Sequence, residues 1–338
     1  MVVGSAAGKA ILLGEHAVVY GRPAVAVPLS DLRATAEVQP AGDGRDGSGR
    51  DVVIRAEDLG RVYRLAERYD DDAAEALQAT VRNVLAHLGV DAAGEGLEIV
   101  VRSRIPVARG LGSGTAVATA MVRALARHYG RDLPAAVVSD LVFRTEVILH
   151  GTPSGVDNTV VAHERPVWFR RGLEPELLDL HAPLVLVIGD TGVPANTREA
   201  VAAVCALREA NPDTIDARFD AIGALAEAGR AALCEGDMGR LGALMTRNQE
   251  HLCALGVSTP GLDRIVAAAL AAGALGAKLS GGGRGGCAIA LVTEAARRVV
   301  AAAMDAAGAA QVHATEVRSE AGGTACTPPH SATVVPPC

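Results

Sequence analysis

The apolar positions along this chain follow two periods, one typical of helices and one typical of strands. Residues 73–88 carry apolar side chains at helical spacing, and the pattern ends at Gly89, a residue that suits a helix C-terminus. The same spacing predicts a helix that ends at about His128 and a second one from about Leu133 to His150. It also predicts several helical segments between Asn196 and Ala272, and a last helix that begins at Glu294. Short apolar runs predict strands at 10–13, 24–27, 52–54, 97–101, 184–188 and 311–317, and a glycine loop with a strand occupies 278–292.

This order of elements predicts an α+β fold, because strands and helices do not alternate as regularly as in a doubly wound parallel sheet. The runs at 10–13 and 24–27 read as two strands or as a strand and a short crossover, and 42–49 as a surface loop. A length of 338 residues suits two domains. The pattern changes after Trp168, so we place the first domain at 1–178, the second at 179–319 and a loose tail at 320–338.

Composition narrows the class of protein. Hydrophobic residues make up 49% of the chain, no apolar run is long enough to span a membrane, and no signal-peptide pattern precedes the first strand. The 32 basic and 39 acidic residues give a net charge of −7, which excludes an electrostatic footprint for nucleic acid or an anionic membrane. The six cysteines form no Cys-x-x-Cys and are expected to be reduced thiols. We therefore expect a cytoplasmic protein with no nucleic-acid and no membrane partner.

The segment after the strand at 97–101 predicts a phosphate-binding loop. Alternating glycines and two hydroxyl residues lead directly into a helix, at Gly110, Leu111, Gly112, Ser113, Gly114 and Thr115. Glycines let backbone N–H groups converge on one point, and the helix N-terminus adds partial positive charge there. The segment is not a Walker loop, since no Gly-Lys-Ser/Thr follows. The alternative is a tight turn in which Ser113 or Thr115 caps the helix.

Two carboxylates near the next helix are candidates for chemistry. Glu146 lies beside the apolar stripe of the helix that ends at His150, so it is expected to be half-buried and to need a partner, such as Mg²⁺. Asp157 follows a Pro-Ser-Gly turn that fixes its backbone, where its carboxylate can accept a proton from a substrate hydroxyl. Taken singly, a salt bridge for Glu146 and an Asx-type helix cap for Asp157 are the favoured explanations.

Four segments together resemble the GHMP kinases: residues 7–21, 106–113, 150–158 and 278–287. They occur in the family's order and at its spacing, so the resemblance covers the chain from about residue 5 to 318. It implies a two-domain fold with the active site in the cleft between the domains, and an ATP- and Mg²⁺-dependent kinase of a small alcohol. Within the family, the segment Gly14–Gly21 is most similar to the members that act on mevalonate, which implies phosphorylation of its primary hydroxyl.

The resemblance also implies roles for individual residues. Asp157 matches the catalytic aspartate, and Lys9, a lysine in an otherwise apolar strand, matches the catalytic lysine beside it. Glu146 matches the Mg²⁺-binding glutamate, with Ser113 as a second metal ligand. The loop of residues 110–115 matches the ATP phosphate loop. Substrate-side positions are matched by Glu15, His16, Thr197, Gly281 and Gly282, although Asn196 and Glu199 also have the spacing of a simple helix cap before Thr197.

Two positions depart from the family's pattern. Gly114 stands where the family has a second serine near the metal, so Ser113, Thr115 or water is expected to replace that ligand. Arg284 interrupts a run of glycines, and its charge either reaches phosphate or points to solvent. The alternatives for function are a GHMP kinase of another small alcohol, such as phosphomevalonate or homoserine, and a non-catalytic nucleotide-binding sensor. Family members are often dimers, so a homodimer is possible.

Overall fold

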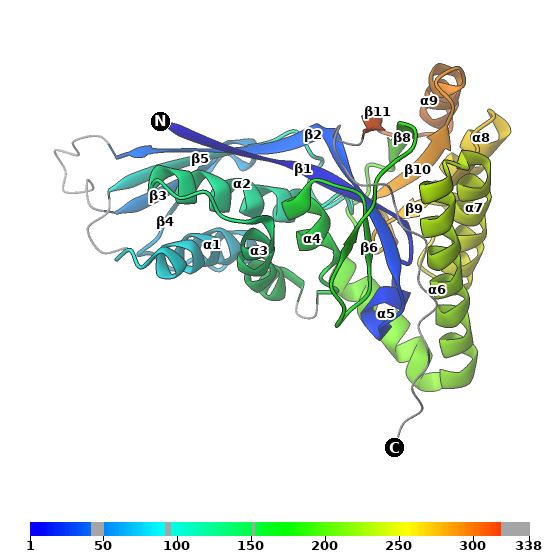
Figure 1. Cartoon of the computed structure of the whole chain (residues 1–338), viewed down its shortest axis with the longest axis horizontal. Helices are drawn as coiled ribbons and strands as arrows, with labels where there is room; N and C mark the ends of the chain where they lie inside the picture. Colours follow the sequence, from blue (N-terminus) through cyan, green and yellow to red (C-terminus); the bar gives the residue numbers. More distant parts are fainter. Residues whose placement is uncertain (42–50, 92–95, 151–152, 319–338) are drawn as a thin grey trace.

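The computed structural model describes residues 1–41, 51–91, 96–150 and 153–318, which form two β-sheets flanked by helices (Figure 1). This arrangement agrees with the predicted α+β class. The surface loop predicted at 42–49 and the tail predicted at 320–338 lie outside the described residues.

The first sheet is built mainly from the N-terminal half of the chain. Its strand order is β4-β3-β5-β2-β6-β7, and β1 pairs with β2 off this path. The strands are β1 (Val2–Leu13), β2 (Ala24–Pro40), β3 (Val52–Ala56), β4 (Arg61–Arg64), β5 (Leu97–Ser103), β6 (Val167–Phe169) and β7 (Glu176–Leu177). Only β3 and β5 run parallel, since a helical crossover joins them, while the remaining pairs are antiparallel.

The first two strands are much longer than their apolar runs predicted. Beyond Leu32, buried residues of β2 alternate with partly exposed ones, as expected for a strand with one face on the core and one toward solvent. A short 3-10 helix, Ala17–Tyr20, connects β1 to β2, so the two segments are two strands and not a strand with a crossover. The strand β4 was not predicted, because its four residues are too few for a recognisable alternation.

Four helices cover one face of the first sheet (Figure 1). They are α1 (Asp72–Leu88), α2 (Ser113–His128), α3 (Ala135–His150) and α4 (Val156–His163). Asp71 caps α1 by accepting a hydrogen bond from the backbone N–H of Ala73, and Gly89 ends the helix at φ +70°, as its position predicted. Helix α4 was not predicted, because eight residues after a Pro-Ser-Gly turn give barely two helical turns of pattern.

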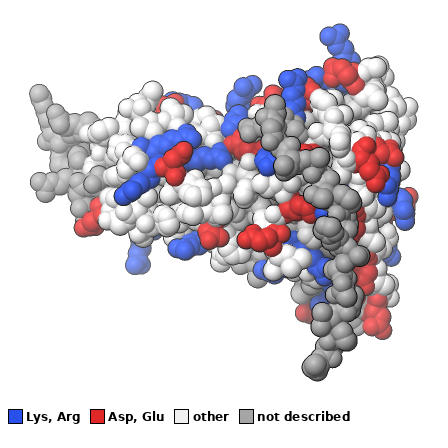
Figure 2. Space-filling view, in the orientation of Figure 1, with Lys and Arg blue, Asp and Glu red and all other residues white. Residues whose placement is uncertain are grey.

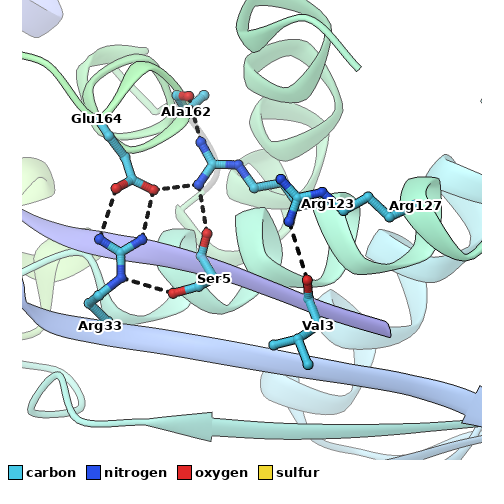
Figure 3. A network of polar contacts seen from close by, with 7 residues as sticks. All are labelled: Val3, Ser5, Arg33, Arg123, Arg127, Ala162 and Glu164. Carbon is cyan, nitrogen blue, oxygen red and sulfur yellow. Dashed lines mark hydrogen bonds and ion pairs between the residues drawn. The ribbon is translucent and has the colours of Figure 1, made fainter. Parts of the chain in front are cut away.

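An ion-pair network fixes the end of α4 against the sheet (Figure 3). Glu164, which follows the helix in a left-handed conformation at φ +49°, receives two hydrogen bonds from Arg33 of β2, at 2.8 and 3.0 Å. Arg123 of α2 also binds this carboxylate, and it donates to the carbonyls of Ala162 and Ser5 at 2.8 and 2.7 Å. Charge-assisted bonds from one strand and one helix therefore hold the end of α4 in place, and Ser5 of β1 accepts hydrogen bonds from both arginines.

The second sheet has the strand order β11-β8-β10-β9, with every pair antiparallel. Its strands are β8 (Leu184–Asp190), β9 (Gly276–Ser280), β10 (Cys287–Val292) and β11 (Gln311–Val317). The helices around it are α5 (Thr197–Ala210), α6 (Pro212–Glu235), α7 (Met238–Ala254), α8 (Pro260–Ala271) and α9 (Arg297–Ala306). Helix α9 begins three residues after the predicted Glu294, because a turn at Thr293–Ala296 precedes it.

The two sheets share apolar core between them. Leu13 of β1 packs so closely on Gly229 of α6 that a Cβ there would lie 2.1 Å from Leu13 Cδ1. One cluster of buried residues includes Leu12 and Leu13 of the first sheet together with Leu186 and Ile188 of the second. The predicted domain boundary at 178/179 falls between β7 and β8, and it stays a prediction.

The surface carries both signs of charge. On the face seen in Figure 2, basic and acidic side chains lie close to one another instead of forming a patch of one sign. Cross-strand pairs such as Arg102–Glu37, at 2.7 Å, are part of this pattern. Among the described residues, none of the helices combines the length and the apolar character that crossing a membrane requires.

Candidate active site

A cavity of about 580 Å³ opens between the two sheets, and residues from both halves of the chain line it. Of the site residues predicted from the sequence, the cavity is lined by Lys9, Glu15, His16, Gly110, Gly112, Ser113, Gly114, Thr115, Glu146, Asp157, Thr197, Gly281 and Gly282. Leu111 is the exception, because its side chain is fully buried beneath the loop. The fold therefore brings together residues that the sequence spreads over most of its length.

Lys9 and Asp157 form an ion pair at the wall of this cavity. The Nζ atom of Lys9 lies 3.0 Å from Oδ2 of Asp157, and only 3% of the lysine side chain is exposed against 27% of the aspartate. Strand β1 supplies Lys9, and the first turn of α4 supplies Asp157. Gly155, not Asp157, occupies the cap position of α4, so the alternative of an Asx-type cap does not apply. Asp157 is the counter-charge that a buried lysine requires.

The glycine loop lies directly against this pair. Gly112 precedes α2 at φ +73°, and a Cβ at this position would lie 2.8 Å from Cγ of Lys9. Gly110, at φ +78°, leaves only 2.7 Å between its would-be Cβ and the carbonyl oxygen of Ser280. Both glycines are thus required by conformation and by space. Without side chains, the loop exposes backbone N–H groups at the N-terminus of α2, which suits a phosphate group.

Glu146 lies at the base of the cavity and is buried more deeply than predicted, with 1% of its surface exposed. Thr115 Oγ1 donates a hydrogen bond to Glu146 Oε1 at 2.8 Å. Burial raises the pKa of Glu146 to about 7, and the negative charge of Asp157 contributes in the same direction. A cation placed here would favour the ionised carboxylate.

The donor set at this position suits Mg²⁺. It consists of the carboxylate of Glu146 and the hydroxyls of Thr115 and Ser113, which are the hard oxygen ligands that Mg²⁺ prefers. Ser113 Oγ donates to the carbonyl of Ile105 at 3.3 Å, whereas Thr115 is the hydroxyl that faces Glu146. No group of three His, Cys, Asp or Glu side chains within the described ranges makes a metal cage. Mg²⁺ commonly needs only one or two carboxylates, because phosphates and water complete its shell.

Sequence reasoning missed the partner of Glu15. The carboxylate of Glu15 forms a fully buried ion pair with Lys278 Nζ, and it accepts a hydrogen bond from Asn248 Nδ2 at 3.1 Å. Burial lowers the pKa of Lys278, while the charge of Glu15 opposes that shift. Lys278 stands alone among apolar residues of β9, the same unusual setting that drew attention to Lys9. A lone lysine among apolar residues was therefore the feature of the sequence that could have predicted a buried counter-charge for Lys278.

His16 sits beside this ion pair in an unusual backbone conformation, at φ +62°. Its Nε2 donates a hydrogen bond to the carbonyl of Gly282 at 3.0 Å, which connects the end of β1 to the loop between β9 and β10. Burial lowers the pKa of His16 to about 4, and the charges of Lys278 and Arg284 add to the effect. His16 is therefore neutral at physiological pH.

The start of α5 forms another part of the cavity wall. Asn196 Oδ1 accepts a hydrogen bond from the backbone N–H of Glu199 at 3.2 Å, so the capping chemistry expected from the spacing is present. Thr197 lines the cavity next to Arg198, a residue that sequence reasoning did not single out. Arg284, by contrast, is exposed and does not line the cavity. Cys287 is buried and carries a free thiol, as expected for a small core residue.

Comparison with known proteins adds a second kind of observation. The chain matches the family model of the GHMP kinases N terminal domain over residues 74–164, and that of the GHMP kinases C terminal over residues 230–310. A mevalonate kinase from Thermococcus sibiricus is 37% identical over 289 residues, covering 81% of this chain and 84% of that protein. A mevalonate kinase from Pyrococcus furiosus is 34% identical over 290 residues, with coverage of 81% and 84%.

Solved structures of mevalonate kinases are also similar to this chain. The crystal structure of L. major mevalonate kinase in complex with R-mevalonate matches with a TM-score of 0.79 and 28% identity, covering 95% of this chain and 97% of that chain. The mevalonate kinase of Methanococcus jannaschii matches with a TM-score of 0.78 and 25% identity, covering 94% and 98%. The likeness therefore extends over both sheets and the cavity between them.

Proposed function

This chain belongs to the GHMP kinase family of ATP-dependent kinases, and we propose that it transfers the terminal phosphoryl group of ATP to the primary hydroxyl of mevalonate. The observation that carries the proposal is the Lys9–Asp157 pair, at 3.0 Å, facing the glycine loop in one cavity. Phosphoryl transfer depends mainly on positioning and on charge neutralisation. In this cavity the glycine loop and Asp157 can position the reacting groups, and Lys9 can neutralise charge.

Asp157 and Lys9 are the proposed catalytic residues. The part of Asp157 that is exposed opens into the cavity, where its carboxylate can orient the acceptor hydroxyl and receive its proton. Lys9 is held in place by burial and by Asp157, so its positive charge stabilises the negative charge that develops on the oxygen atoms during transfer. The loop of Gly110, Leu111, Gly112, Ser113, Gly114 and Thr115 would bind the phosphates of ATP through its backbone N–H groups.

Glu146, with Thr115 or Ser113, is the proposed place for Mg²⁺. When bound, the ion would neutralise phosphate charge. Glu146 would enter this role as a carboxylate, although burial raises its pKa to about 7 in the protein alone. We expect EDTA to abolish activity and excess Mg²⁺ to restore it.

The acceptor would lie toward the second sheet. Glu15, His16 and Thr197 line that part of the cavity, together with Gly281 and Gly282. Because His16 is neutral and its Nε2 donates to the carbonyl of Gly282, its Nδ1 would accept a hydrogen bond from a hydroxyl of mevalonate. Arg198, which also lines the cavity, would add positive charge for a carboxylate of the acceptor.

A coupled assay of ADP release tests the proposal. Purified protein is mixed with ATP, Mg²⁺ and each of several acceptors: mevalonate, phosphomevalonate, homoserine and galactose. We expect mevalonate to give the highest kcat/KM, and a higher value with another alcohol would contradict the substrate assignment.

The alternative of a non-catalytic sensor rests on Gly114. The hydrogen bond from Thr115 to Glu146 speaks against it, because a hydroxyl still faces the carboxylate. The G114S variant decides the point. Activity that is absent in the natural protein and appears in G114S would identify a sensor, whereas activity in both identifies an enzyme.

A further inference from the structure

An ion pair joins the phosphate loop to the second sheet through Arg109, a residue that lines the cavity and to which the proposed function gives no role. Arg109 directly precedes Gly110, and its Nε lies 2.8 Å from Oδ1 of Asp190, the last residue of β8. The same guanidinium donates to the carbonyl of Gly192 at 3.0 Å. One side chain thus binds the last residue of β8 and the loop that follows it.

The environment of this pair differs from that of a surface salt bridge. Asp190 is buried, and its Oδ1 also accepts a hydrogen bond from the backbone N–H of Gly192 at 2.8 Å. The side chain of Arg109 is only 17% exposed. Both partners are therefore shielded from solvent, and removing either leaves the other with unmet charge.

Backbone contacts run beside the ion pair. The N–H of Ala195 donates to the carbonyl of Ala108 at 2.8 Å. Ala108 itself is held in a left-handed conformation at φ +55°, which costs free energy and persists only where surrounding contacts enforce it. A Cβ added at Gly286 would lie 2.9 Å from the carbonyl oxygen of Arg109. The segment 108–110 is therefore clamped between two loops of the second sheet.

The two joined segments carry different parts of the site. Residue 110 begins the loop proposed to bind ATP, and the segment 190–196 leads into α5, whose first residue, Thr197, lies on the acceptor side. Transfer requires donor and acceptor in line, and a misplacement of about 1 Å can cost on the order of a hundredfold in rate. Arg109 lines the cavity, but its guanidinium is directed to Asp190 and to the carbonyl of Gly192, so it can set the spacing of the two segments without binding a substrate.

We propose that Arg109 is a positioning residue, and that its ion pair with Asp190 fixes the phosphate loop relative to the start of α5. The effect of this pair on the rate of transfer rests on the proposed function, whereas its effect on the rigidity of the two segments does not. Since each substrate still meets its own half of the cavity, loss of the pair lowers the rate of transfer more than it lowers affinity.

Steady-state kinetics of R109A, R109K and D190N test the effect on the rate of transfer. We expect kcat of R109A to fall on the order of a hundredfold, with KM for ATP and for mevalonate within about threefold of the natural values. R109K retains one charged contact and recovers part of kcat. The matched control is R165A, which removes a comparable ion pair to Asp179, at 2.6 Å and away from the cavity.

Hydrogen–deuterium exchange tests the effect on the rigidity of the two segments without any substrate. In R109A we expect faster exchange in both segments, 108–114 and 190–196, whereas R165A leaves both unchanged. Unchanged exchange at 190–196 in R109A overturns the proposal, even if the protein acts on an alcohol other than mevalonate. A large rise in KM for ATP at unchanged kcat also overturns it, because Arg109 would then bind the nucleotide directly.

Discussion

Lys9 Nζ lies 3.0 Å from Asp157 Oδ2, so a strand from the start of the chain and a helix from its middle meet in one buried charge pair. Because Asp157 is proposed to receive the acceptor proton, D157N should lower kcat by about 10²- to 10⁴-fold while the protein remains folded. Circular dichroism checks the fold, and the ADP-release assay gives kcat. D132N is the control, since the Asp132 side chain is 90% exposed and outside the cavity. A D157N variant with near-natural kcat contradicts the assignment.

Gly112 and Gly130 offer a matched pair of glycine substitutions. Both have a left-handed conformation, at φ +73° and +67°, but a Cβ at Gly112 would lie 2.8 Å from Lys9 Cγ, while nothing lies within 4 Å at Gly130. G112A and G130A should each lose about 1–2 kcal/mol of stability from the backbone conformation. Only G112A should also lose activity, because it displaces Lys9. Equal activity in the two variants would show that Lys9 tolerates displacement.

His16 should make the protein sensitive to mild acid. Its pKa is about 4 in the folded state, below the ordinary value of 6.5, so between these values the unfolded chain binds the proton and the folded one does not. This part of the stability is complete above pH 6.5 and is lost as the pH falls toward 4. The loss at pH 5 amounts to about 2 kcal/mol.

Urea unfolding at pH 7.5 and pH 5 measures this effect. H16N should show a smaller difference between the two pH values than the natural protein, and Asn tolerates the positive φ of this position better than most residues. H87N, at an exposed histidine, should keep the natural difference. An unchanged pH dependence in H16N would mean that His16 is not the responsible group.

The buried pair of Glu15 and Lys278 should show strong energetic coupling. K278M leaves the carboxylate of Glu15 buried without its cation, which should cost about 3–5 kcal/mol of unfolding free energy. The double variant E15Q/K278M should be less destabilised than the sum of the single variants, because no uncompensated charge remains. Additive losses in this cycle would rule out the coupling.

An exposed pair supplies the comparison for that cycle. Arg102 contacts Glu37 at 2.7 Å and Glu57 at 2.5 Å, with 43% of the arginine side chain exposed. R102M should cost at most about 1 kcal/mol, because solvent screens the pair.

Local patterns in the sequence were enough to predict much of the site. A glycine-rich loop running into a helix follows from a few adjacent residues, and α2 does begin at Ser113. The lysine in the apolar segment of β1 pointed to a counter-charge, and the structure places Asp157 there. In each case the signal lies within one short segment, so no knowledge of long-range packing was needed.

The contacts that join distant segments could not be predicted in this way. Arg109 meets Asp190, and Glu15 meets Lys278, only because two sheets face one another. Nothing in the neighbouring residues of either partner specifies the other. The length of β2 was missed because polar residues on an open sheet face interrupt its apolar run without ending the strand. In β1 the run is interrupted by glycines and by Lys9, which are buried in the strand.

The two halves of the chain meet at the cavity through glycine backbones. Gly110 approaches Ser280, and a Cβ at Gly281 would lie 3.0 Å from Cα of Gly110. The shape of the main chain defines this part of the joint, beside the side-chain contact of Arg109 with Asp190. A Cβ at Gly282 would lie 3.1 Å from Cα of Thr197, so the acceptor side of the cavity packs on the same glycine segment. A larger side chain at Thr197 would therefore press on the main chain that connects the two halves.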